Sequence, residues 1–125
     1  MASAIRQGLR ILVVEDEFMI AMAVEAVVTD AGGVVVDMAA TLEQALAMAR
    51  TEEFDVALLD INLNGEASFP VASVLCERGI PYAFVTGYSR QMVPEAFASA
   101  PILTKPYARS DLIRTLRAIV SAPSS

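Results

Sequence analysis

The chain has 125 residues, and 15 acidic against 9 basic side chains give it a formal net charge of −6. An acidic chain without clustered cations repels nucleic acid and anionic membrane surfaces, so we expect neither as a partner. The absence of His and the single Cys exclude His-based catalysis, His-ligated metal sites and an intramolecular disulfide. Hydrophobic residues make up 55% of the chain, which excludes disorder as its main state.

The start of the chain does not resemble an export signal or a membrane anchor. The apolar run Ile11–Val14 ends at Glu15, and it is far shorter than the roughly 20 residues that a membrane helix needs. We therefore expect a cytoplasmic protein.

Short apolar runs alternate with longer helical patterns along the chain. The runs lack polar alternation, and continuous apolar strands are typical of a parallel sheet covered by helices on both faces. The predicted strands are Arg10–Val14, Val34–Ala39, Asp55–Leu59, Tyr82–Val85 and Ile102–Thr104.

The first two predicted helices have clear ends. The stretch Phe18–Ala31 stops at two glycines, which favour a helix C-terminus, and we expect its Met19 and Met22 to lie in the core. The second helix begins with a capping box, in which Thr41 is the N-cap and Gln44 is the third helical residue.

The later helices are marked by Gly and Pro. The third helix ends at Gly79, and the last begins near Ser110. Pro94 suits the first position of a fourth helix and Pro101 stops it, so this helix is predicted to be short. We expect the open loop at 87–93 to be mobile.

Five strand–helix units with right-handed crossovers form an open, doubly wound sheet. We therefore predict an α/β, flavodoxin-like (βα)5 fold, with a five-stranded parallel sheet of order 2-1-3-4-5 and a short or disordered fourth helix. The domain is expected to span residues 8–121, with flexible termini at 1–7 and 122–125.

Carboxylates stand at the ends of two predicted strands. Glu15 and Asp16 follow the first strand and Asp60 follows the third, and the carboxyl ends of such strands meet at one edge of the sheet. Two carboxylates about 4 Å apart repel by about 4 kcal/mol at an effective dielectric constant near 20. An oxygen-rich site of this kind favours Mg²⁺, which accepts carboxylates, waters and a phosphate.

Two further strand ends add a hydroxyl and an ammonium group, from Thr86 and from Lys105, which precedes Pro106. With a cation bound, an Asp carboxylate at this edge can attack phosphorus and form an acyl phosphate. Thr86 and Lys105 are then placed to hold the phosphoryl oxygens. The pattern predicts phosphoryl transfer to a carboxylate.

These residues resemble the receiver domain of bacterial two-component response regulators. The resemblance rests on Ile11–Glu17, Leu58–Asp60, Thr86 and Lys105-Pro106, in receiver order and spacing. It implies that Asp60 is the phosphoacceptor, that Thr86 and Lys105 contact the phosphoryl group, and that the Lys105–Pro106 bond is cis. The implied Mg²⁺ ligands are Glu15 (mainly through water), Asp16, Asp60 and the backbone carbonyl of Asn62.

The same resemblance implies a signalling domain rather than an enzyme, with self-catalysed phosphotransfer and slow self-dephosphorylation. Because the chain has no His, the donor is expected to be a sensor histidine kinase, a histidine phosphotransfer protein or a small acyl phosphate. We expect a stand-alone receiver without an output domain. It would signal by protein contact, around residues 87–100 and the last helix, or drain phosphate as a sink.

Residues Phe84–Tyr88 resemble the motif of the FAT GUY receiver subfamily, which is often free-standing and is associated with kinases of the HWE/HisKA_2 type. Ile102 departs from the common receiver pattern, in which Tyr or Phe precedes the Lys by three residues. An aromatic switch is therefore not expected here, and the loop at 87–93 is the predicted moving element.

Two other functions fit parts of the pattern. A phosphatase of the haloacid dehalogenase type needs Asp-x-Asp after the first strand, whereas Glu15–Glu17 lacks it and Asn62 replaces the second Asp after Asp60. A flavodoxin-like protein that binds a nucleotide or flavin needs a first loop rich in Ser, Thr and Gly to cradle a phosphate. The first loop of this chain is acidic instead. Steady turnover of a phosphate ester would support the first alternative, and flavin absorbance the second.

Overall fold

The computed structural model describes residues 5–87 and 93–121, and it is built around a five-stranded sheet. Every neighbouring pair in this sheet is parallel, and the order is β2-β1-β3-β6-β7. This is the predicted 2-1-3-4-5 order, because β4 and β5 form a separate hairpin. The strands are β1 (Arg10–Val14), β2 (Val34–Ala39), β3 (Val56–Asp60), β6 (Tyr82–Thr86) and β7 (Ile102–Thr104).

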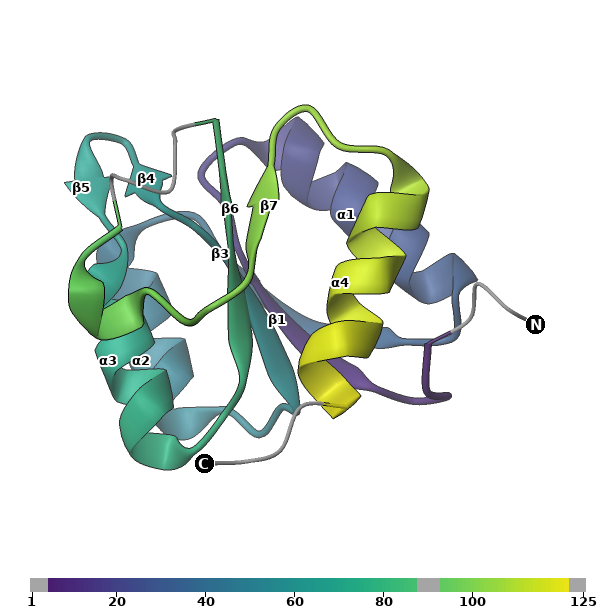
Figure 1. The fold of residues 1–125 in the computed structure, drawn as a ribbon, viewed down its shortest axis with the longest axis horizontal. Helices are drawn as coiled ribbons and strands as arrows, with labels where there is room; N and C mark the ends of the chain where they lie inside the picture. The colour runs from purple at the N-terminus through teal and green to yellow at the C-terminus, as the bar shows by residue number, and fades with distance from the viewer. Residues whose placement is uncertain (1–4, 88–92, 122–125) are drawn as a thin grey trace.

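Helices cover both faces of the sheet, as Figure 1 shows. Helices α1 (Phe18–Asp30) and α4 (Arg109–Ser121) pack on one face. On the other face lie α2 (Leu42–Thr51), α3 (Phe69–Arg78) and the short 3₁₀ helix η2 (Glu95–Phe97). Within the described ranges, no helix is both long enough and apolar enough to span a bilayer. The predicted doubly wound α/β fold is confirmed.

Alternate residues of the central strand feed two apolar cores. Ile11 and Val13 pack with α1 and α4, whereas Leu12 and Val14 pack with α2 and α3. None of these four side chains is more than 2% exposed. Burial on both faces explains why the strand is apolar at every position, which was the signal that predicted a parallel sheet.

Two predicted helix ends have the expected local chemistry. The Thr41 hydroxyl accepts the N–H of Gln44 at 3.1 Å, and the Gln44 side chain accepts the N–H of Ala40 at 2.9 Å. Both bonds satisfy donors near the start of α2. Gly79 ends α3 with φ at 73°, a left-handed conformation that favours glycine.

The start of α4 agrees with the prediction. The helix begins at Arg109, next to Ser110. The Asp111 carboxylate accepts the N–H of Ala108 at 2.9 Å and so satisfies a donor at the start of the helix.

The region of the fourth helix is short, as predicted, and consists of the three residues of η2. The predicted mobile loop lies largely outside the described residues, which omit 88–92. The predicted flexible ends fall partly outside them as well, at 1–4 and 122–125. Ile5, in the segment predicted as a flexible terminus, is buried in the core beside α1.

The exposed face of α1 corrects one prediction. Met19 and Met22 do not fill the core: they are 79% and 40% exposed, and Phe18 beside them is 70% exposed. Ala21 and Val24 face the sheet instead. Since α1 is apolar on nearly all sides, its sequence alone does not distinguish the buried face from the exposed one.

Candidate functional site

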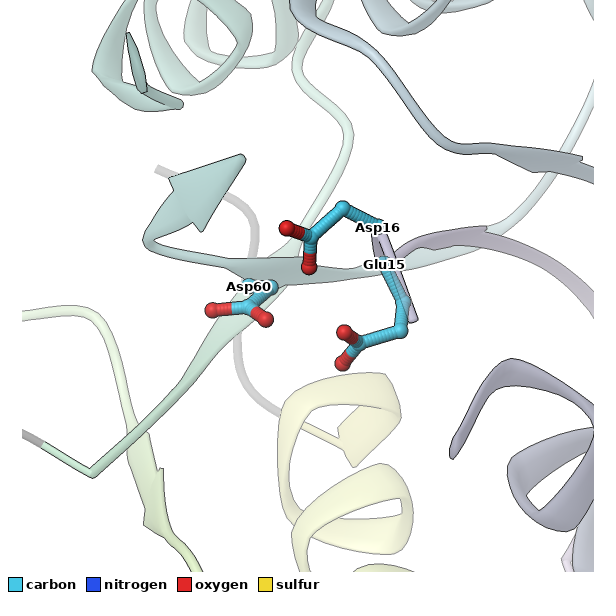
Figure 2. Close-up of side chains that lie close together, drawn as sticks. All are labelled: Glu15, Asp16 and Asp60. Atoms are coloured by element: carbon cyan, nitrogen blue, oxygen red, sulfur yellow. The ribbon is translucent and has the colours of Figure 1, made fainter. Parts of the chain in front are cut away.

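Three carboxylates converge at the C-terminal edge of the sheet. Figure 2 shows Glu15 and Asp16, which follow β1, beside Asp60 at the end of β3. One oxygen from each of them lies within 4.8 Å of the others, because β1 and β3 are neighbouring parallel strands. Glu15 and Asp60 are only 6% and 7% exposed. The structure therefore brings together the acidic residues predicted from the sequence.

Lys105, the only lysine of the chain, reaches into this cluster from the end of β7. Its Nζ lies 3.2 Å from Glu15 Oε1 and 3.0 Å from Asp60 Oδ2. Burial lowers the pKa of Lys105, but the two carboxylates outweigh burial and raise it above its ordinary value, so the amine stays charged. The Lys105–Pro106 bond is cis, as predicted. One ammonium facing three carboxylates leaves the site anionic.

The carboxyl group of Glu15 has an unusual proton affinity. Burial raises its pKa to about 7, and the charge of Asp60 acts in the same direction, whereas the Glu17 N–H and Lys105 lower it. Glu15 therefore exchanges its proton near neutral pH. A cation that binds here competes with that proton.

Asp60 is held by partners at both oxygens. Its Oδ1 accepts the N–H of Asn62 at 3.2 Å, and its Oδ2 faces the ammonium of Lys105. Thr86 ends the adjacent strand β6 and is 1% exposed, and its carbonyl accepts the N–H of Lys105 at 2.8 Å. These contacts fix Asp60 and its neighbours relative to one another.

The site opens as a pocket of about 360 Å³, lined by Asp16, Asp60, Asn62, Thr86 and Lys105 among others. A larger groove of about 830 Å³ lies elsewhere, between α2, α3 and η2. That groove is lined by several apolar side chains and has no converging carboxylates. The smaller pocket therefore carries the chemistry.

Asn64 and Gly65 are not among the site residues predicted from the sequence, but both line the pocket. They connect β4 (Asn62–Leu63) and β5 (Glu66–Ala67), and the N–H of Asn64 donates to Asp16 Oδ2 at 3.0 Å. An Asn-Gly pair is a strong hairpin signal. The signal was in the sequence, but the contact with Asp16 depends on the tertiary fold.

The chain matches the response regulator receiver domain family over residues 11–117, which is most of its length. It belongs to this family. Domains of this family generally act in signalling rather than as true enzymes. The match does not favour the haloacid dehalogenase or the flavodoxin-like alternative.

Known proteins resemble this chain in sequence, and the solved structures among them also resemble it in fold. The receiver is 27% identical to the transcriptional regulatory protein PdtaR of Mycobacterium tuberculosis over 116 residues, which are 90% of this chain but only 57% of PdtaR. It is 36% identical to SdrG from Sphingomonas melonis, with a TM-score of 0.79 and coverage of 96% and 99% of the two chains. The response regulator PhyR from Brucella abortus is 28% identical, with a TM-score of 0.78 and coverage of 94% of this chain and 49% of PhyR.

Proposed function

We propose that this receiver accepts a phosphoryl group on Asp60 with the help of Mg²⁺. The observation that carries the proposal is the convergence of Glu15, Asp16 and Asp60 within 4.8 Å, with Lys105 beside them. Carboxylates alone repel one another, and the one nearby ammonium does not neutralise them. A divalent cation bound among the carboxylates would neutralise them.

The donor set fits Mg²⁺ better than a softer metal. All candidate ligands are oxygens, from Glu15 (through water), Asp16, Asp60 and the carbonyl of Asn62, and the described residues of the pocket offer no Cys or His. Oxygen ligands suit Mg²⁺, which also retains waters that a phosphate can replace. When bound, Mg²⁺ screens the charge between the carboxylates and an incoming phosphoryl group.

The proposed transfer step uses Asp60, which lines the pocket. A carboxylate oxygen of Asp60 attacks phosphorus, and the new O–P bond replaces the P–N bond of a phosphohistidine or the P–O bond of an acyl phosphate. The departing imidazole takes up a proton, and a departing carboxylate needs none. Lys105 then pairs with a phosphoryl oxygen, and Thr86 donates its hydroxyl to another.

The donor is proposed to be a sensor histidine kinase or a histidine phosphotransfer protein. Phe18, Met19 and Met22 form an exposed apolar patch at the start of α1, which follows directly after Glu17 in the pocket lining. Large exposed apolar side chains mark interaction sites, and a donor that contacts this patch has its phosphohistidine close to Asp60.

Finer assignments rest on shorter signals. The motif Phe84–Tyr88 supports membership of the FAT GUY subfamily and a donor of the HWE/HisKA_2 type. The proposed receiver domain spans 8–121, and its likeness to SdrG extends over 99% of that chain. We propose that the domain works as a stand-alone receiver in the cytoplasm. It would pass on its signal by protein contact or serve as a phosphate sink, and would lose its phosphoryl group slowly by itself.

The test is incubation with acetyl phosphate and Mg²⁺, followed by intact mass spectrometry and peptide mapping. We expect one added phosphoryl group on Asp60, none in EDTA and none in Asp60→Asn. Asp37→Asn is the matched control, because this half-buried Asp in β2 lies outside the pocket. Its replacement changes the net charge of the protein by the same amount as Asp60→Asn. Incorporation that persists in Asp60→Asn contradicts the proposal.

A further inference from the structure

The hairpin β4–β5 crosses the edge of the acidic pocket and contacts Asp16 through its backbone. Asn64 and Gly65 form its two-residue turn with φ at 52° and 89°, the pair of positive values found in a type I′ turn. This conformation directs the Asn64 N–H to Asp16 Oδ2 at 3.0 Å, although the two residues are 48 positions apart.

The turn is held from several sides. Gly65 donates its N–H to the Asn62 side-chain oxygen at 2.7 Å, and Leu63 in β4 is buried with 1% exposure. Asn62 in turn donates its own N–H to Asp60 Oδ1. A single hairpin therefore contacts both Asp16 and Asp60.

We propose that the Asn64–Gly65 turn is a positioning element that presets the Asp16 carboxylate for Mg²⁺. This inference rests on the proposed function, since it concerns the same site. A carboxylate has two oxygens, so Asp16 can keep the Asn64 hydrogen bond at one of them and offer the other to a cation. Holding the ligand before the ion arrives lowers the entropy cost of binding.

The proposal assigns Gly65 a specific role. A Cβ at this position would meet no atom within 4 Å, so space does not require glycine. The backbone does, because φ at +89° is strained for most side chains and especially for β-branched ones. Gly65→Val therefore shifts the turn, and with it the Asn64 N–H, without a steric clash in the core.

A matched control exists elsewhere in the chain. Gly79 also has a positive φ, of 73°, and a Cβ there would also meet no atom within 4 Å, but it ends α3 away from the pocket. Gly79→Val adds comparable backbone strain without touching the metal site. Gly65→Asn is the rescue variant, since Asn tolerates positive φ far better than Val.

The experiment measures Mg²⁺ and Ca²⁺ dissociation constants of the folded proteins by calorimetry, with urea unfolding in EDTA as a separate measure of stability. We expect Gly65→Val to bind Mg²⁺ about tenfold more weakly than wild type. A loss of this size is typical when a group that orients a metal ligand is removed. Ca²⁺ tolerates irregular geometry, so its binding should weaken less. Gly79→Val should lose stability but keep both constants, and Gly65→Asn should recover most of the Mg²⁺ affinity.

Unchanged Mg²⁺ binding in Gly65→Val, or an equal loss for Mg²⁺ and Ca²⁺, overturns the positioning role and leaves the proposed function intact. A wild-type protein that binds no Mg²⁺ overturns the proposed function itself. If Gly65→Val does not fold, Gly65→Ala applies the same test with a smaller side chain.

Discussion

Replacing Asp16 by Asn is expected to stabilise the metal-free protein while removing its response to Mg²⁺. Asp16 lies within 4.8 Å of the carboxylates of Glu15 and Asp60, whereas Lys105 makes its ion pairs with those two residues. Asn keeps the side-chain oxygen that accepts the Asn64 N–H. The substitution therefore removes charge but preserves shape and the hydrogen bond.

The magnitude follows from the spacing. Two negative charges at the 4.8 Å limit of the cluster repel by about 3.5 kcal/mol at an effective dielectric constant near 20. Asp16 has two such neighbours, so the repulsion before screening by water is about 7 kcal/mol. Because Asp16 is partly exposed and water screens its charge, we expect a net gain of about 1–2 kcal/mol in the free energy of unfolding.

The assay is urea unfolding in EDTA and in millimolar Mg²⁺, at a pH above the Glu15 pKa of about 7, where Glu15 is ionised. In EDTA, Asp16→Asn should be more stable than wild type. In Mg²⁺, wild type should gain stability because the unfolded chain lacks the site, and the variant should gain little. Below the Glu15 pKa, the advantage of the variant should shrink.

Glu77→Gln is the matched control, since it changes the net charge by the same amount as Asp16→Asn but at an exposed position of α3. It should leave the free energy of unfolding nearly unchanged. A variant that is less stable than wild type in EDTA and still gains fully from Mg²⁺ refutes the electrostatic reasoning.

Two further predictions concern the pH dependence of the site and the docking of the donor. The folded protein keeps the Glu15 proton up to about pH 7, whereas the unfolded chain releases it near the ordinary value of 4.5. The free energy of unfolding of the metal-free protein should therefore fall as pH rises between these values, by on the order of 3 kcal/mol. In urea titrations, Glu15→Gln should abolish this fall. If the variant shows the same pH dependence as wild type, the fall does not come from Glu15. Met19→Glu places a charge in the exposed patch of α1 and should slow transfer from a histidine kinase that phosphorylates the wild type, by about tenfold. Labelling by acetyl phosphate should be unchanged, so equal slowing with both donors would argue against a docking role.

Much of the fold was predictable because its signals are local. The apolar runs located all five strands of the main sheet to within a residue at each end. The Thr41 capping box and Gly79 marked helix ends that the structure confirms. Each of these signals acts within a few residues of the chain, where side-chain size and backbone hydrogen bonding are independent of distant contacts.

The exposed side of α1 was not predictable in the same way. Met19 and Met22 have the composition of core residues, yet only packing against the sheet decides which side of an apolar helix is buried.

The sequence by itself determined which residues stand at the strand ends. Each of them follows or ends an apolar run: Glu15, Asp16, Asp60, Thr86 and Lys105. Parallel strands carry such residues to one edge of the sheet. Only the tertiary structure decided how they interact. The burial that raises the pKa of Glu15 and the bond from Asn64 to Asp16 both depend on distances between segments far apart in the chain. Electrostatic and hydrogen-bond energies change steeply over a few ångströms, and a sequence pattern does not specify positions that finely.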